Sequence, residues 1–415
     1  MVYTSIMYKK TTKTLNIHIS LNKIMADKKE KVEENVEEVE KVEGEGGGNA
    51  LVMIGIVIVA LIILVYAYTS ITGNAIFGFD GFGSNEVRIG FMGPLTGDAA
   101  SYGHAIKRGV EMALKDSKLQ NVKIIYEDTR CDGEEAVSAI NKLINIDKVS
   151  AIIGDVCSGA TLAVAPIAEQ NKVVMISASS TSPEITNAGE YIFRTIPSDT
   201  HQGKFGAELV YDLGLRNLSI LYGNEEYGVG FEGVLKENFE SLGGLVVAEE
   251  SFERGSTDLR TQLTKIRKAR PEAIYIISNS PDSSVAALKQ IKQMGIKAKV
   301  FGSEGLKGPE IAATKVAENL TITSVSAGTP AFVEQYMREH GLAIQPFAPQ
   351  AYDSFNALAK AIQNGARTGS EIKLQLDNLK FSGVSGDIEF DSNGDVSGSY
   401  QVYRLVNGTF VLADY

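Results

Sequence analysis

From Val87 onward, short apolar runs alternate along the chain with segments in which apolar residues recur every three or four positions. The runs, among them VKIIYED, SAIIGDV and AIYIIS, have the length of strands, and continuous apolarity is typical of parallel strands covered on both faces. The segments between them, among them EEAVSAINKLIN and SSVAALKQIKQMG, have the periodicity of amphipathic helices. This alternation predicts a doubly wound α/β fold. Two such series follow one another, over about 87–199 and 200–326, so we expect two lobes with a binding cleft between them.

The N-terminal part of the chain has a different pattern. No charged residue occurs from Gly46 to Phe79, and the stretch from Leu51 to Tyr68 is almost wholly aliphatic. This predicts one transmembrane helix over 49–72. A secretory signal is the alternative, but its apolar region is normally shorter and close to the terminus. The long hydrophilic stretch that comes first here favours an uncleaved anchor.

The residues on either side of the apolar stretch read as a tail and a linker. Residues 26–48 are rich in Glu and Lys, with too few apolar positions to bury, so we expect a mostly disordered tail over 1–48. Met25 is an alternative start. Residues 73–86 form the predicted linker. Lysines and acidic residues nearly cancel in the tail, so its placement in the cytoplasm depends mainly on evidence that the large domain is outside.

The two cysteines provide such evidence. Cys131 and Cys157 each follow a predicted strand directly, and no histidine is next to either one in the sequence. A metal pair is an alternative, but a disulfide is the better interpretation, and it requires an oxidising compartment. Three N-x-S/T sequons are compatible with an exterior location; they begin at Asn217, Asn319 and Asn407.

Two strand ends carry clusters of hydroxyl groups. Cys157-Ser158-Gly159 opens a predicted helix, and Ser-Ala-Ser-Ser-Thr-Ser follows the next strand. Carboxyl ends of parallel strands border the crevice where ligands bind, and a helix N-terminus presents N–H donors that suit a carboxylate. The pattern predicts capture of a small anion, with ordinary helix capping as the alternative.

The remaining sequence features argue against nucleic-acid binding, nucleotide binding, calcium binding and catalysis. Net charge is −11 and no basic stripe carries interleaved aromatics, so we expect no nucleic-acid partner. Gly228–Gly233 matches G-x-G-x-x-G, but Asn-Glu-Glu-Tyr separates it from its strand and would place carboxylates against a pyrophosphate. Asp391-x-Asn393-x-Asp395 lacks the glycine and closing glutamate of a calcium loop, so we expect a hairpin turn. The chain carries no catalytic motif that we recognise, and we expect no enzyme activity, no cofactor and no metal.

Seven stretches, in order, carry a family resemblance: VRIGFMGPLTGDAASYGHAIKRGVEMA, YEDTRCD, GDVCSGATLAVAPIAEQ, MISASSTSPEIT, FRTIPSDTHQG, YGNEEYGVG and FGSEGL. The chain resembles the branched-chain amino acid (Leu/Ile/Val) binding proteins, which are type I periplasmic solute-binding proteins of ABC transporters. The resemblance covers about 87–411. It implies two Rossmann-like lobes, one from 87–199 and 327–398, the other from 200–326 and 399–415.

The resemblance also implies a ligand grip. Ser158, aided by Thr181, would hold the α-carboxylate of an amino acid. The carbonyl of Ser179, the hydroxyl of Thr181 and the carboxylate of Glu304 would hold its ammonium group. A buried carboxylate needs a cation, which gives Glu304 a physical reason to be there. A glutamate in a surface turn is the alternative interpretation of Glu304.

Three kinds of residue would complete the site. Tyr102 and Tyr227 are similar to the aromatic residues that form the wall of the side-chain pocket, and Asp199 would support the closed state. Where relatives often have tyrosines before the proline of the next helix, this chain has Asn279-Ser280-Pro281. We therefore expect a larger or more polar pocket.

The implied function is that of a membrane-tethered receptor of an ABC importer. It would bind a branched-chain or related amino acid by hinge closure and then dock on the permease subunits. It would be a single-pass protein of the cell membrane with its large C-terminal domain outside. A sensory receptor for an amino acid or small amide, not coupled to transport, is the alternative.

Overall fold

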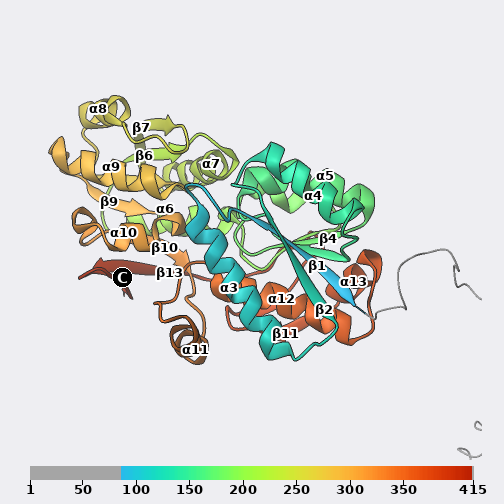
Figure 1. Ribbon diagram of the computed structural model, residues 1–415. Coiled ribbons are helices and arrows are strands. Elements are labelled where there is room, and N and C mark those ends of the chain that lie inside the picture. The colour runs from blue at the N-terminus through green and yellow to red at the C-terminus, as the bar shows by residue number, and fades with distance from the viewer. Residues whose placement is uncertain (1–85, 414–415) are drawn as a thin grey trace, which may run out of the picture. The chain divides into compact units, whose positions relative to one another are not determined.

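The computed structural model describes residues 86–413, which form two α/β lobes (Figure 1). Lobe 1 is built on a five-stranded parallel sheet of order β2-β1-β3-β4-β5. Its strands are β1 (Val87–Gly93), β2 (Val122–Asp128), β3 (Ala151–Ile153), β4 (Val174–Ser177) and β5 (Ile192–Arg194).

Lobe 2 is built on a seven-stranded sheet of order β14-β13-β10-β9-β8-β6-β7. Strands β6 to β10 run parallel, and β13 and β14 add an antiparallel edge. The strands are β6 (Asn217–Gly223), β7 (Leu245–Phe252), β8 (Ala273–Ile277), β9 (Lys299–Gly302), β10 (Thr321–Val325), β13 (Tyr400–Val406) and β14 (Thr409–Leu412). A separate hairpin pairs β11 (Lys380–Ser382) with β12 (Asp387–Glu389).

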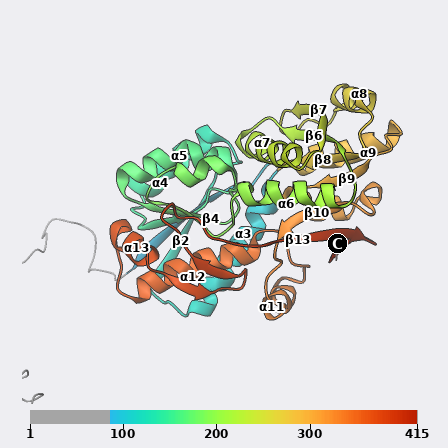
Figure 2. The ribbon, with the colours of Figure 1, turned by 180° about the vertical axis from the view of Figure 1, so that it is seen from behind.

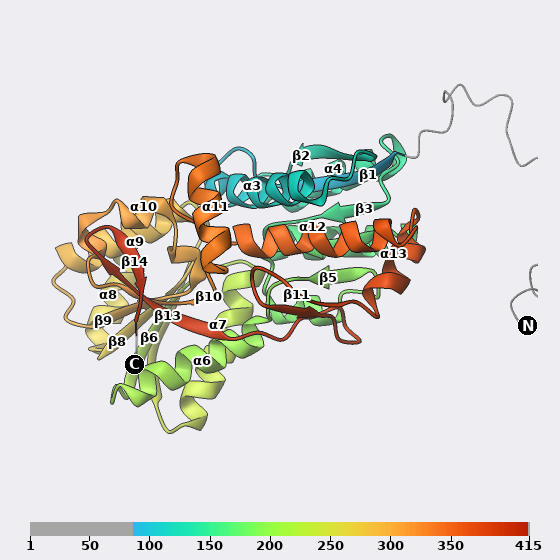
Figure 3. The same ribbon diagram turned by 90° about the horizontal axis from the view of Figure 1, so that it is seen from below.

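Helices cover both sheets, as Figure 2 shows from behind. Lobe 1 carries α3 (Ala100–Ser117), α4 (Gly133–Asn145), α5 (Ser158–Asn171), η1 (Pro183–Asn187), α11 (Pro330–His340), α12 (Ala348–Gln363) and α13 (Gly369–Leu376). Lobe 2 carries α6 (Asp199–Asp212), α7 (Glu226–Ser241), α8 (Arg260–Ala269), α9 (Pro281–Gln293), η2 (Glu304–Leu306), α10 (Pro309–Ala312) and η3 (Lys315–Ala317). Helix α12 packs along α3 (Figure 3). The two helices are far apart in the sequence, so the C-terminal part of the chain returns to the first lobe.

The parallel strands of both lobes have the same order, since β7-β6-β8-β9-β10 repeats β2-β1-β3-β4-β5. In such sheets the strand order reverses beside the first strand, and the loops at the carboxyl ends there border a crevice. The chain passes between the two sheets three times: after β5, after β10 and before β13. The predicted doubly wound architecture is therefore present, while the predicted residue bounds of each lobe stay a prediction.

The position of strand β8 explains why every one of its residues is apolar. All five of its residues are buried. Ile274 and Ile276 pack into one core cluster, and Ala273, Tyr275 and Ile277 into another on the opposite face of the sheet. Successive side chains of a strand point to opposite faces, so a sheet covered by helices on both sides requires an apolar residue at every position.

The motifs set aside above have structural roles. Gly228 and Gly233 lie inside α7, and the Glu225 carboxylate accepts hydrogen bonds from the N–H groups of Tyr227 and Gly228. The first turn of α7 is therefore capped by the chain's own acidic residue. Residues 391–395 form the predicted turn, closed by a bond from the Asp391 N–H to the Asp395 carbonyl.

The predictions for the N-terminal part of the chain concern residues that the structure does not describe. The tail over 1–48, the transmembrane helix over 49–72 and the linker, except its last residue, lie outside the described residues. Within 86–413, no helix has both the length and the apolar character needed to cross a membrane.

A buried ion pair joins two distant segments of lobe 1. The guanidinium group of Arg194, at the end of β5, is fully buried and binds the Asp395 carboxylate through two hydrogen bonds of 2.6 and 2.7 Å. The same group donates to the carbonyls of Thr181 and Ser182 at 3.1 and 2.9 Å. Arg194 therefore holds the second hydroxyl cluster in place from behind.

We predict that Asp395→Asn lowers the free energy of unfolding by about 3–5 kcal/mol, because it leaves the buried Arg194 cation without its counter-charge. Chemical denaturation measures the change. Asp377→Asn is the matched control: it breaks an exposed Lys373–Asp377 pair on α13 and should cost less than about 1 kcal/mol. Equal effects of the two substitutions would contradict this role of Arg194.

Candidate functional site

A cavity lies between the lobes, at the carboxyl ends of strands from both sheets. Six of the eight predicted ligand-binding residues line it, three from each lobe. The lining consists of Tyr102, Val156, Cys157, Ser158, Ser179 and Phe347 from lobe 1, and Tyr227, Asn279, Glu304 and Gly305 from lobe 2. Its volume of about 30 Å³ exceeds the roughly 10–15 Å³ that one water needs but is far below that of typical small-molecule pockets. The two lobes contact each other across this cavity, which is too small for a typical organic ligand.

Helix α5 directs an uncapped N-terminus at this cavity. Its N-cap residue, Cys157, makes no side-chain capping bond, and its first turn carries no acidic residue. The hydroxyl oxygen of Ser158 accepts a 3.2 Å bond from the Ser182 N–H, so its own proton remains available to a ligand. Free N–H groups, a hydroxyl proton and the helix dipole together suit an anion such as a carboxylate.

The second hydroxyl cluster packs directly behind the first. The Ser179 hydroxyl donates to the Val156 carbonyl at 2.7 Å, which fixes the loop after β4 against the loop after β3. Thr181 is fully buried and is not among the residues that line the cavity. Its carbonyl accepts the Asp199 N–H at 2.8 Å. The loop after β4 is thus joined to the start of α6, where the chain first enters lobe 2.

Several buried oxygen atoms without hydrogen-bond partners lie at the cavity or directly behind it, in both lobes. Within 86–413, these include Oε2 of Glu304, both carboxylate oxygens of Asp199, the Tyr227 hydroxyl and Oγ1 of Thr181. Asp199, like Thr181, is buried behind the lining. Such atoms are costly to bury without a partner, so their presence marks a place where a polar or cationic group fits.

Electrostatics agree with this geometry. Burial raises the pKa of Glu304 to about 7. Burial, followed by the negative charge of Glu304, raises the pKa of Asp199 well above its usual range. The closed cleft therefore brings acidic groups together where a positive charge would stabilise them.

Aromatic side chains close the cavity from both lobes. The Tyr102 hydroxyl donates to the Gly305 carbonyl across the cleft. Tyr227 of α7 lines the cavity from lobe 2. The sequence analysis missed three lining residues, Val156, Gly305 and Phe347. The Phe347 ring meets Tyr102 edge-on at 5.9 Å. It lies in the irregular segment before α12, where neither periodicity nor a motif marks it. Asn279 lines the cavity two residues after the end of β8, and the larger or more polar pocket expected from it stays a prediction.

The disulfide predicted from the sequence is present and is contacted by a residue of lobe 2. Cys131 and Cys157 are bonded, with 5.4 Å between their Cα atoms. Arg254, from the loop after β7 in lobe 2, donates to the Cys131 carbonyl at 2.9 Å and approaches Sγ of Cys157 at 3.6 Å. The disulfide therefore presents acceptors to a cation of the opposite lobe. Its sulfur atoms are bonded to each other, so they are not thiolate ligands for a metal.

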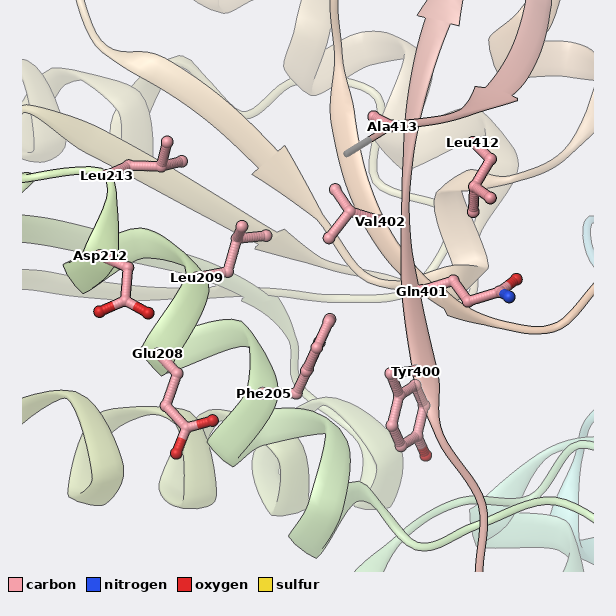
Figure 4. A pocket seen from close by; sticks show the side chains of 10 residues that line it. All are labelled: Phe205, Glu208, Leu209, Asp212, Leu213, Tyr400, Gln401, Val402, Leu412 and Ala413. Carbon is pink, nitrogen blue, oxygen red and sulfur yellow. The ribbon is translucent and has the colours of Figure 1, made fainter. Parts of the chain in front are cut away.

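A larger groove of about 480 Å³ lies between α6 and the C-terminal hairpin (Figure 4). Phe205 and Leu209 of α6 and Val402 of β13 form its apolar part, and Glu208 and Asp212 lie on α6 beside it. None of the predicted site residues lines this groove. The uncapped helix, the buried Glu304 carboxylate and six predicted residues are at the cleft, which is therefore the candidate site.

Known proteins resemble this chain over the region that forms both lobes. A family model described as periplasmic binding protein matches residues 86–409. A leucine-, isoleucine-, valine-, threonine- and alanine-binding protein of Pseudomonas aeruginosa is 30% identical over 353 residues, which is 80% of this chain and 93% of that protein.

Solved structures agree. A leucine-binding protein of Thermotoga maritima superposes with a TM-score of 0.75 at 29% identity, covering 79% of this chain and 98% of that one. A branched-chain amino acid transporter substrate-binding protein of Streptococcus pneumoniae, in complex with isoleucine, has a TM-score of 0.72 at 27% identity and covers 79% and 100%. The predicted resemblance is confirmed: the chain belongs to the periplasmic binding protein family, in its type I branch of Leu/Ile/Val-binding proteins.

Proposed function

We propose that this protein binds an α-amino acid between its lobes by hinge closure. The main support for the proposal is that one side of a small cavity suits an anion and the other side suits a cation. The uncapped N-terminus of α5, with Ser158, suits a carboxylate, and the buried Glu304 carboxylate suits a cation. An α-amino acid carries both groups on neighbouring atoms, so one molecule satisfies both sides.

Closure has a direct physical basis in this arrangement. Ser158 and Ser179 belong to lobe 1, and Glu304 belongs to lobe 2. A ligand that bonds to both stabilises the closed state in proportion to its extra contacts there. The Tyr102–Gly305 and Arg254–Cys131 bonds would act with the ligand, because they too form only when the lobes meet.

The proposal extends to the place of this receptor in the cell. We infer an extracytoplasmic receptor, tethered by a helix over 49–72, that delivers an amino acid to an ABC permease. The family match and the disulfide support the exterior location, and the apolar stretch in the sequence supports the tether. Cell fractionation tests the tether: the full chain should sediment with membranes, whereas deletion of 49–72 should release it. Sedimentation of both forms would contradict a tether at this segment.

We predict that Ser158→Ala and Glu304→Gln each weaken amino-acid binding more than tenfold, because each removes a bond to a charged group of the ligand. Isothermal titration calorimetry of the full chain against the twenty amino acids identifies the ligand and measures the loss. Ser138→Ala on α4 and Glu237→Gln on α7 replace exposed residues of the same types and should bind like the unmodified protein. Unchanged affinity in folded Ser158 and Glu304 variants would contradict the assigned site.

The pH dependence follows from Glu304. Its pKa is raised to about 7, so the carboxyl group is largely protonated below that pH and must lose its proton to pair with an ammonium group. Ligand affinity should therefore fall by up to about tenfold per pH unit as the pH drops below 7. Glu304→Gln should flatten this profile between pH 5 and 8. If the pH profile is the same in both proteins, Glu304 does not pair with the ammonium group of the ligand.

A further inference from the structure

The three N-x-S/T sequons of the chain have no part in the ligand site, since none of their residues lines the cleft cavity. They are Asn217-Leu-Ser219, Asn319-Leu-Thr321 and Asn407-Gly-Thr409. This motif is the acceptor for N-glycosylation. Because the motif requires both the asparagine and the hydroxyl residue two positions later, the modifying enzyme has to reach both side chains. Their exposure therefore distinguishes one sequon from another.

Two of the sequons have a buried hydroxyl group. Asn217 is half-buried at the start of β6, and Ser219 is fully buried within that strand, which pairs with β7 on one side and β8 on the other. Asn319 is exposed in the loop before β10, but Thr321 is only 1% exposed. In the folded protein, neither motif presents both of its side chains to an enzyme.

The sequon in the C-terminal hairpin is exposed throughout. Asn407, Gly408 and Thr409 are all exposed. Asn407 and Gly408 form the two-residue turn between β13 and β14, with φ of +50° and +75°. The backbone N–H of Asn407 donates to the Glu318 carboxylate at 3.2 Å, so the main chain makes this contact. Such a turn favours an Asn-Gly pair, but it does not require a hydroxyl group at position 409.

This turn lies at the end of lobe 2 that is opposite to the cleft. Strand β13 runs antiparallel to β10, with Tyr400 opposite Val325 and Arg404 opposite Thr321. The end of β13 is therefore at the amino end of β10, and the strand points away from lobe 1 (Figure 1). The ligand cavity is at the carboxyl ends of the parallel strands. A group attached to the turn would not obstruct the cleft.

Strand β14 gives a physical reason for a hydrophilic group at this position. It is the edge strand of the seven-stranded sheet, and its residues Val411 and Leu412 are 42% and 60% exposed. An exposed apolar edge strand is a template for pairing with another chain, and proteins commonly protect such edges. A bulky, solubilising sugar chain beside the start of β14 would provide this protection.

We propose that Asn407 is an N-glycosylation site and that its glycan covers the β14 edge. The side-chain nitrogen of Asn407 forms a bond to the anomeric carbon of a lipid-linked sugar phosphate. The bond between that carbon and the phosphate oxygen breaks, the phosphate leaves with the electron pair, and the amide nitrogen gives up a proton to the transferase. The inference rests on the exterior location in the proposed function, because this modification belongs to exported proteins.

Mass spectrometry of tryptic peptides tests the proposal on the full chain, purified from the cells in which it naturally occurs. Cleavage after Arg404 releases Asn407 in a peptide without the other two sequons. This peptide should carry a mass increment that fragments as a sugar chain, whereas the peptides with Asn217 and Asn319 should have their unmodified masses. An unmodified Asn407, or a sugar on one of the other two asparagines instead, would overturn the assignment.

Two substitutions separate the modification from the turn. Asn407→Gly removes the acceptor and retains the left-handed turn, and Thr409→Val removes the hydroxyl group and retains a β-branched side chain. Each should abolish the mass increment. Thr409→Ser keeps the sequon, so this matched control should keep the increment. An increment that persists in either of the first two variants would contradict N-glycosylation at this motif.

Light scattering tests the role of the glycan at the edge strand. At the same concentration, Asn407→Gly should scatter more light than Thr409→Ser, because its β14 edge is uncovered. Equal scattering would overturn the protective role.

Failure of this proposal differs from failure of the exterior location. Protease added to intact cells should digest the large domain if it is outside. Digestion combined with an unmodified Asn407 would overturn the glycosylation and leave the exterior location standing. A domain that is protected from protease in intact cells but digested after lysis would overturn the exterior location, and the inference would fall with it.

Discussion

The carboxylate of Glu304, buried at the centre of a closed cleft, is the constraint on which the rest of the site depends. Glu304 is 2% exposed, and its Oε2 atom has no hydrogen-bond partner among the described residues. A single buried negative charge is unfavourable, and its neighbour Asp199 makes it more so. Opening the lobes would return these groups to water, and a bound cation would neutralise them. In the proposed function, closure of the lobes and binding of a cation would therefore be energetically coupled.

Lobe 1 provides the side of the cavity that suits a negatively charged group. Arg194 and Asp395, which are 201 residues apart in the sequence, form a buried bidentate pair that also fixes the Thr181 and Ser182 carbonyls. The Ser182 N–H in turn donates to the Ser158 hydroxyl at the start of α5, so this support extends to the helix N-terminus. The disulfide between Cys131 and Cys157 adds a rigid edge that Arg254 reaches from the other lobe.

Local patterns in the sequence predict the fold well because strand and helix periodicity is a local property. The apolar runs became the parallel strands, although SAIIGDV is a strand only over Ala151–Ile153 because the chain turns at Gly154 to start α5. Strand ends also place hydroxyls and carboxylates at the same edge of a sheet, so six predicted residues do line one cavity. Thr181 and Asp199 lie behind it instead. Phe347 and Arg254 could not be found this way, because their roles arise from contacts between segments far apart in the sequence.

Affinity for a matched pair of ligands tests the central claim most directly. The α-amino acid that binds most tightly and its 2-hydroxy acid counterpart differ in the ammonium group that Glu304 is proposed to hold. Calorimetry of the full chain at pH 7.5 should show the hydroxy acid binding at least tenfold more weakly, with most of the difference lost in Glu304→Gln. Equal affinity of the two ligands would contradict the account, because the buried carboxylate would then have no part in recognising a cation.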